Sequence, residues 1–174
     1  MCSLTPHVVR PLFATVIALH LAAPLSLAQA PRAGATFVAA RGGANLVGNT
    51  YRVRDAKPEP GGGVSVGAFV SRRWIVELEA WMRAANPECC GPRRREMLFG
   101  VSIIRPLTTT RLQPYMLGGL ALLRADHSAV QVQVGLGAQF ALHRRVWMAV
   151  DLRGNGGGST MIVRPTAAII YYFR

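Results

Sequence analysis

Long apolar runs are missing from this sequence, although its hydrophobic content is high. Hydrophobic residues make up 51% of the 174 residues, and the mean hydropathy is +0.25. No segment, however, has the ~20 consecutive apolar residues that a membrane-spanning helix needs. The mostly apolar run Leu12–Ala23 is too short for this purpose. The apolar residues of the chain must therefore follow a pattern other than that of spanning helices.

The first 28 residues instead have the pattern of a cleavable signal peptide. Arg10 is followed by the apolar run Leu12–Ala23 and then by the small residues Ser26 and Ala28. A basic region, a short apolar region and a small-residue cleavage site follow in this order in secretory signals. We predict a signal peptide at 1–28 and one mature domain at 29–174. A retained N-terminal helix is the alternative interpretation.

Acidic residues and lysine are scarce. The chain has 8 Asp and Glu against 20 Lys and Arg, a formal net charge of +12, and Lys57 is its only lysine. A basic balance ordinarily suggests nucleic-acid binding, but an exported chain rarely meets nucleic acid. The arginines are also scattered, apart from Arg93–Arg95. We expect them to bind membrane phosphates, or to lie at strand ends as solvated charges.

Cysteine is limited to three positions. Cys2 falls within the predicted signal peptide, which leaves the adjacent Cys89 and Cys90. Neighbouring α-carbons are ~3.8 Å apart, which is shorter than the usual span of a disulfide, so a bridge between them would be strained. Two thiols without nearby histidines do not form a metal site. We predict neither metal nor cofactor and interpret the pair as an incidental loop feature.

The most informative pattern that is present is the alternation in Val130–Leu142, which reads VQVQVGLGAQFAL. Side chains of an extended strand point alternately to its two faces, so valine, leucine and phenylalanine share one face and glutamine and glycine the other. The segment is longer than an ordinary strand, and its polar face is uncharged. This combination is typical of a strand that crosses a membrane with lipid on one side and a polar lumen on the other.

Similar segments recur along the mature chain. We predict eight strands: Thr36–Gly48, Val64–Ser71, Trp74–Ala84, Glu96–Leu107, Arg111–Arg124, Ala129–Leu142, Val146–Gly154 and Thr160–Phe173. Three tight connections alternate with four that are mostly longer: Asn49–Gly63, Ala85–Arg95, Ala125–Ser128 and Asn155–Ser159. A sheet in lipid must have no free edges, because every backbone N–H and C=O needs a partner. The pattern therefore predicts an all-β protein, an eight-stranded antiparallel up-and-down transmembrane β-barrel.

The alternation also assigns the charged residues of the strands to the lumen. An eight-stranded barrel is only wide enough for side chains to fill it, and buried charges must pair there. We predict a polar lumen network that plugs the barrel, made of Arg41, Glu77, Glu79, Arg83, Asp151, Arg153 and Arg164. Pro114 and Pro165 fall within strands, and we expect β-bulges at both because proline cannot donate a ladder hydrogen bond.

The pattern resembles the small eight-stranded outer-membrane β-barrels of the OmpA and OmpX kind. The segments Gln113–Leu120 and Ile169–Phe173 are similar to strands of that family. The resemblance implies an outer-membrane location and recognition of the C-terminal strand by the barrel-assembly machinery. In that family a terminal aromatic residue is the assembly signal, whereas here Phe173 is penultimate and Arg174 follows.

The expected function is that of a monomeric outer-membrane barrel with a structural or surface-interaction role and with lipid and lipopolysaccharide phosphates as partners. The alternatives are a narrow porin-like channel, a soluble periplasmic lipocalin-like barrel that binds an apolar ligand, and a lipid-modifying barrel enzyme. The enzyme hypothesis rests on Asp126, His127 and Ser128. Adjacent residues usually point apart, and a nucleophile must contact its base, so we predict that the chain is not an enzyme.

Overall fold

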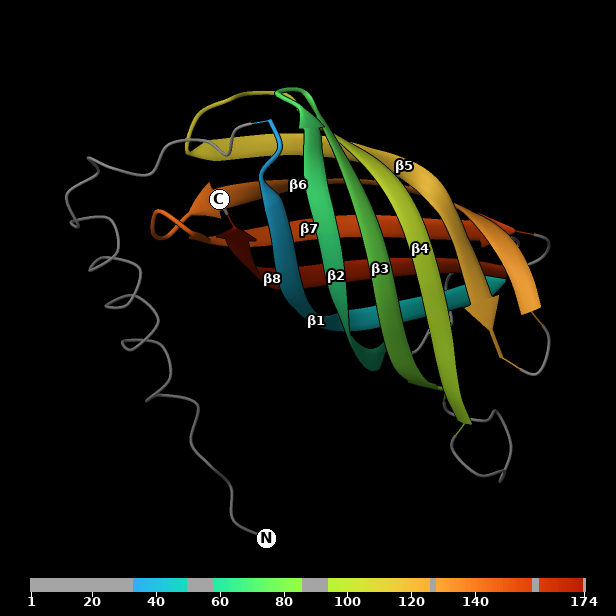
Figure 1. Cartoon of the computed structure of the whole chain (residues 1–174). Helices are drawn as coiled ribbons and strands as arrows, with labels where there is room; N and C mark the ends of the chain where they lie inside the picture. Colours follow the sequence, from blue (N-terminus) through green and yellow to red (C-terminus); the bar gives the residue numbers. More distant parts are fainter. Residues whose placement is uncertain (1–32, 50–57, 86–93, 126–127, 158–159, 174) are drawn as a thin grey trace, which may run out of the picture.

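The chain forms a single antiparallel sheet that closes into a barrel (Figure 1). The computed structural model describes residues 33–49, 58–85, 94–125, 128–157 and 160–173. Its eight strands follow one another in chain order: β1 (Thr36–Asn49), β2 (Pro58–Ser71), β3 (Trp74–Ala85), β4 (Arg94–Pro106), β5 (Leu112–Arg124), β6 (Ser128–Ala141), β7 (Val146–Gly157) and β8 (Thr160–Phe173). The predicted all-β, eight-stranded antiparallel barrel is confirmed. The predicted signal peptide and the pair Cys89–Cys90 lie outside the described residues.

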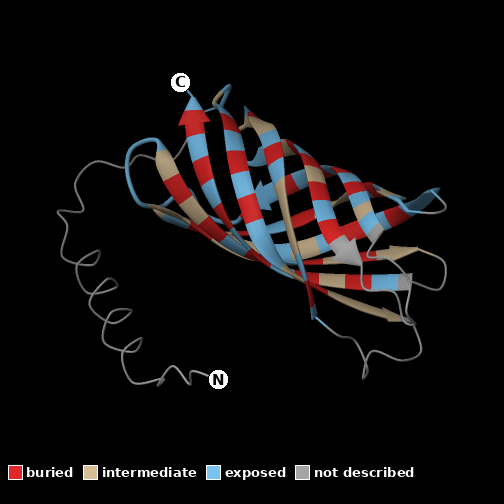
Figure 2. Ribbon diagram, turned by 90° about the horizontal axis from the view of Figure 1, so that it is seen from below, coloured by how far each residue is buried: buried red, intermediate tan, exposed pale blue. Residues whose placement is uncertain are grey.

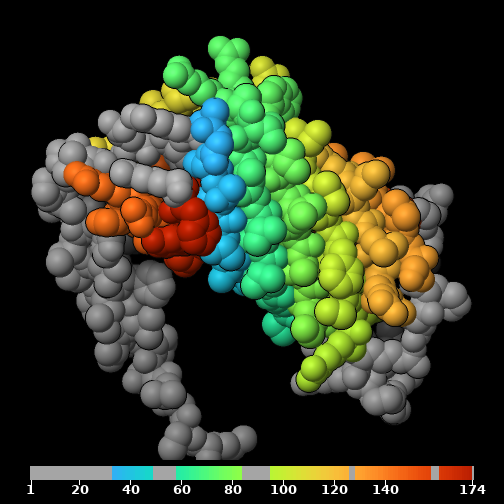
Figure 3. Space-filling model, viewed as in Figure 1, coloured from blue at the N-terminus to red at the C-terminus, as the bar shows by residue number. Residues whose placement is uncertain are grey.

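The barrel closes where β1 pairs with β8. Thr36 is opposite Phe173 at one end of this seam, and Asn49 is opposite Thr160 at the other. Each strand also pairs with its sequence neighbour, so no strand is left with a free edge. The outer surface is therefore continuous from β1 in blue through the green strands β2 and β3 to β4 (Figure 3).

Burial alternates along the strands with the predicted period of two (Figure 2). In β6, Val130 and Leu136 are 67% and 66% exposed on the outer face, whereas Gln131 and Gln133 are 1% and 0% exposed in the lumen. Apolar side chains thus cover the outside of the barrel, and the buried polar and charged side chains of the strands lie inside it. This is the reverse of the arrangement in a soluble barrel with an apolar interior.

The two ends of the barrel differ. One end, which we call the terminal rim, carries the start of β1, the end of β8 and the three turns at residues 72–73, 107–111 and 142–145. The opposite end, the loop end, carries the other four connections. Two of these connections, at residues 50–57 and 86–93, are long. The other two span only residues 125–127 and 158–159. The predicted alternation of short and long connections therefore holds at only two of the four positions.

Two strand boundaries differ clearly from those predicted. β2 begins at Pro58 rather than Val64, and β7 extends to Gly157 rather than Gly154. The sequence of β2 reads PEPGGG over its first six residues, which is typical of a turn. In the barrel these residues pair with β1, where Glu59 lies opposite Asn45. The pairing with a neighbouring strand thus overrides the local preference of proline and glycine.

The bulges expected at Pro114 and Pro165 are absent. Pro114 pairs in register with Ala138, and Pro165 with Leu152. Between β1 and β8 the ladder lapses next to Pro165, but the register is the same on both sides of the lapse. The shift of register between β2 and β3 lies instead between Phe69 and Ser71. Both prolines are thus accommodated without an inserted residue.

Candidate functional site: a charged cluster in the lumen

A cluster of six charged side chains crosses the middle of the lumen. Arg41 of β1 is one centre of this cluster: its Nη2 lies 2.9 Å from Oε1 of Glu77, and its Nη1 lies 2.8 Å from Oδ2 of Asp151. The Nε of Arg41 also donates to the hydroxyl of Ser65 over 3.2 Å. One guanidinium group therefore ties together strands β1, β2, β3 and β7.

Arg153 is the second centre of the cluster. Its Nη2 lies 3.2 Å from Oε1 of Glu77, its Nη1 lies 3.3 Å from Oε2 of Glu79, and its Nε donates to Asp151 over 3.2 Å. Glu79 accepts in addition from both terminal nitrogens of Arg164, at 3.3 and 2.9 Å. The two carboxylates of β3 are thus bridged by arginines that come from β1, β7 and β8.

The charges of this central cluster balance within the lumen. Three arginines face three carboxylates, and the six residues are Arg41, Glu77, Glu79, Asp151, Arg153 and Arg164. Their side chains are at most 2% exposed. Buried ions are costly unless they are paired and hydrogen-bonded. The mutual neutralisation explains how so many charges can lie inside a narrow barrel.

Neutral donors complete the cluster, and sequence reasoning did not select them. The hydroxyl of Tyr115 donates to Asp151 over 2.7 Å, and the hydroxyl of Thr166 donates to the other oxygen of the same carboxylate. Gln133 Nε2 lies 3.4 Å from Oε2 of Glu79. All three residues have the inward parity of their strands, so the alternation placed them in the lumen without indicating which carboxylate they contact.

Arg83 belongs to a different group of charges nearer the loop end. It pairs with Glu96, and its Nη1 lies 3.4 Å from Oε2 of Glu59. Neither of these carboxylates was among the predicted network residues. Trp81 lies between the two groups: its ring is stacked under Arg164 at 4.9 Å, and its Nε1 donates to Asn45 over 3.0 Å. Six of the seven predicted residues therefore form one cluster, and Arg83 forms another.

Apolar and aromatic side chains fill the lumen on the side of the terminal rim. The rings of Phe37, Phe69 and Trp147 lie 5.5 to 5.9 Å from that of Tyr172. The buried residues of this layer include Phe37, Phe69, Ile75, Ile104, Leu117, Trp147, Ile170 and Tyr172. The lumen is thus layered, with apolar packing at the terminal rim and charges at mid-depth.

Of the three residues on which the enzyme hypothesis rests, only Ser128 lies within the described part of the chain. Asp126 and His127 lie outside the described residues, and Ser128 is exposed at the start of β6. His143 is exposed in the turn between β6 and β7. Among the described residues there is no group of three His, Cys, Asp or Glu side chains placed to hold a metal ion. The same residues include no helix long and apolar enough to span a bilayer.

The structure is similar to solved structures of small outer-membrane β-barrels. The N-terminal β-barrel domain of Pseudomonas aeruginosa OprF has a TM-score of 0.64 at 15% identity, covering 82% of this chain and 100% of that one. The chain has the fold of small outer-membrane β-barrels. Neisserial surface protein A has a TM-score of 0.63 at 14% identity, covering 80% and 99% of the two chains. Ail, the attachment invasion locus protein of Yersinia pestis, has a TM-score of 0.59 at 12% identity, covering 81% and 99%.

These likenesses are confined to the fold. No protein-family model matches the sequence, and no curated protein matches it either. At identities of 12 to 15%, these structures inform the fold alone. The central cluster must therefore be interpreted from its own geometry.

Proposed function

We propose that the chain is a small integral outer-membrane β-barrel that is exported by a signal peptide at 1–28 and has a structural or surface-interaction role. The apolar outer face supports this location: Val64, Leu120 and Leu136 are 56%, 57% and 66% exposed. A contiguous apolar surface of this kind is costly in water and suits the hydrocarbon core of a bilayer.

The observation that carries the proposed role is the central cluster. Its arginines and carboxylates pair with one another across the lumen. These side chains therefore occupy the space that an open path for solutes would need. The space between Asn45, Trp81 and Arg164 is a cavity of about 10 Å³, roughly the volume that one water requires. The apolar layer between the cluster and the terminal rim adds a second barrier. We infer a plugged lumen rather than a pore.

Conductance across planar bilayers tests the plugged lumen. We expect the purified full chain, inserted into the bilayer, to give no steady conductance, while a known porin inserted in the same bilayers provides the positive control. Insertion is verified separately by protection of the barrel from added protease. A steady single-channel conductance of the inserted protein would favour the narrow porin-like channel instead.

The soluble lipocalin-like alternative makes the opposite prediction about solvent. That fold would place its apolar face inside, whereas here Gln131, Gln133 and Arg153 face the lumen and valines face outward. We expect the mature chain to need detergent and to migrate differently on gels before and after boiling. A mature chain that remains soluble and monomeric without detergent would overturn the membrane proposal.

The remaining proposals concern activity and partners. We propose that the chain has no enzymatic activity, and we expect lipid A to be unchanged in cells that overexpress either the chain or its His127→Ala variant. We further propose that the barrel is monomeric and that β8 delivers the chain to the barrel-assembly machinery. Arg95 and Arg124 at the loop end, both exposed, would contact lipopolysaccharide phosphates, and replacing both with Gln should weaken binding to lipopolysaccharide micelles.

A further inference from the structure

All five acidic side chains of the described residues lie inside the barrel, so the described part of its outer surface carries no negative charge. The five acidic residues that the structure describes each pair with an arginine in the lumen: Glu59, Glu77, Glu79, Glu96 and Asp151. The described charges on the outside are therefore arginines. Six of them lie at the terminal rim: Arg72, Arg73, Arg105, Arg111, Arg144 and Arg145.

Three of these arginines converge on a cavity at the terminal rim. The cavity has a volume of about 340 Å³ and lies between the turn Arg72–Arg73 and the segment Arg105–Thr109. This volume is within the range of small-molecule sites, which is roughly 300–1,000 Å³. The guanidinium groups have no carboxylate partner within the described part of the chain. A pocket with three unneutralised arginines selects an anion, and guanidinium groups match the oxygens of a phosphate in pairs.

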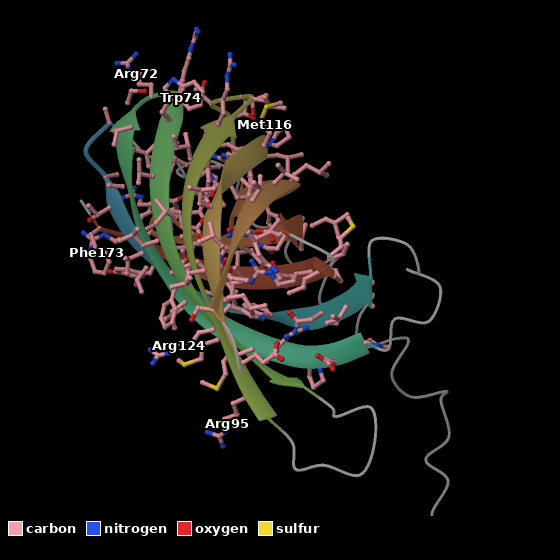
Figure 4. The ribbon with its side chains drawn as sticks, turned by 90° about the vertical axis from the view of Figure 1, so that its right-hand side faces the viewer. Arg72, Trp74, Arg95, Met116, Arg124 and Phe173 are labelled. Atoms are coloured by element: carbon pink, nitrogen blue, oxygen red, sulfur yellow. The ribbon has the colours of Figure 1, made fainter. Side chains whose placement is uncertain are left out.

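The cavity also borders the apolar outer face. Leu107, which lines it together with Pro106, is 54% exposed. Arg105 is stacked over the ring of Trp74 at 5.4 Å, and Trp74 itself is 43% exposed. Figure 4 shows Arg72 and Trp74 at the same end of the barrel, far from Arg95 and Arg124 at the other. Tryptophan and arginine together are typical of the level of lipid headgroups.

Apolar residues continue from this pocket along the outside of β3 and β4. Leu78, Val101 and Ile103 are each 52% exposed there, and Leu78 and Val101 are opposite each other in the register of the two strands. A ligand in the cavity would thus have an anionic group among arginines and apolar chains against this surface. A free phosphate would use only the first of these features.

We propose that this cavity binds the phosphodiester headgroup of an anionic phospholipid, whose acyl chains lie along the outer face of β3 and β4. The inference rests on the proposed membrane function and adds to it a site at the end opposite the loops. The zwitterionic headgroup of phosphatidylcholine would place an ammonium group among three guanidinium groups, so the site should discriminate against it. Phosphatidylglycerol carries no such cation.

Native mass spectrometry of the full chain in detergent, with equal amounts of phosphatidylglycerol and phosphatidylcholine, tests the proposal. We expect phosphatidylglycerol to be retained preferentially. Replacing Arg72, Arg73 and Arg105 with Gln should lower this preference at least about fivefold. The matched control replaces Arg111, Arg144 and Arg145 with Gln, which removes the same charge from the same rim but not from the cavity, and we expect it to keep the preference.

Each outcome decides a separate point. Equal retention of the two lipids by the native chain, or equal loss in the two triple variants, would overturn the site, since only general charge attraction would remain. Displacement of the lipid by inorganic phosphate as readily as by soluble short-chain phosphatidylglycerol would identify a free anion as the ligand and overturn the lipid proposal.

Insertion into vesicles is measured first on the same protein. Failure to insert would refute the membrane function, whereas insertion without lipid preference would refute only this site.

Discussion

Nη1 of Arg41 lies 2.8 Å from Oδ2 of Asp151, although the two residues are 110 positions apart in the sequence. Arg41 is in β1 and Asp151 is in β7, and β8 lies between these strands where the sheet closes. The ion pair therefore spans the seam of the barrel. Strand pairing and lumen chemistry are coupled at this point, because the two side chains meet only when β8 has paired on both sides.

The first prediction concerns the pair of Glu79 and Arg164. The substitution Arg164→Gln leaves a buried carboxylate with one fewer cation, and we expect it to lower the free energy of unfolding by about 3–5 kcal/mol. The double variant Glu79→Gln, Arg164→Gln leaves two arginines and two carboxylates in the cluster, so it should cost clearly less than the sum of the single changes. Urea titration of the vesicle-inserted barrel measures the two single variants, Arg164→Gln and Glu79→Gln, and the double variant. Additive costs would mean that the pair is not coupled.

The second prediction compares Gly61 of β2 with Gly118 of β5. A Cβ atom added to Gly61 would lie 2.8 Å from the ring of Trp81 and 2.6 Å from Nδ2 of Asn45, whereas one added to Gly118 meets nothing within 4 Å. Trp81 is 2% exposed and cannot easily move. We expect Gly61→Ala to destabilise the barrel by about 1–3 kcal/mol and Gly118→Ala to be neutral or slightly stabilising. Equal unfolding midpoints for the two variants would contradict the packing of Trp81 against β2.

Gly61 also explains why the start of β2 could not be predicted from sequence. Proline and glycine in succession favour a turn, and no local pattern distinguishes a turn from a strand that must leave room for a neighbour's side chain. Gly61 is required by Trp81, which is 20 residues away and on another strand. Strand β6, in contrast, was predicted to within one residue at each end, because its alternation is a local property.

The composition of the central cluster was predictable only in part. Period-two alternation placed Arg41, Glu77 and Asp151 on inward faces, and this requires no knowledge of neighbours. Which of these residues lie at one depth depends on the stagger of the strands around the barrel. Arg83 illustrates the limit: it has the same parity as Glu79 but lies two inward positions closer to the loop end, where it pairs with Glu59 and Glu96.

The third prediction concerns the outer face at two depths. Val134 lies at the middle of β6 and is 59% exposed, and Leu112 lies at the terminal rim and is 57% exposed. Arginine on a lipid face costs about 2–4 kcal/mol at the midplane and about 0–1 kcal/mol near the interface. Val134→Arg should therefore impair insertion into vesicles much more than Leu112→Arg does. Similar insertion yields for both variants would contradict the assignment of this face to lipid.

The fourth prediction uses two adjacent tyrosines of β8 that face opposite ways. The hydroxyl of Tyr172 is buried and donates to Oε1 of Gln139 over 3.0 Å, and Nε2 of Gln139 donates in turn to Gln113 over 2.7 Å. Tyr171 is 38% exposed on the outer face, and its hydroxyl accepts from Arg145 over 3.4 Å.

Phenylalanine at position 172 would leave the amide oxygen of Gln139 buried without its donor, whereas Tyr171→Phe removes only an exposed contact at the rim. We expect Tyr172→Phe to lower the free energy of unfolding by about 1–3 kcal/mol and Tyr171→Phe to change it by less than about 0.5 kcal/mol. Urea titration of both variants in the same vesicles makes the comparison. If Tyr171→Phe were the more costly of the two, the inward and outward faces of β8 would have to be exchanged, and with them the lumen position of Arg164, which has the same parity as Tyr172.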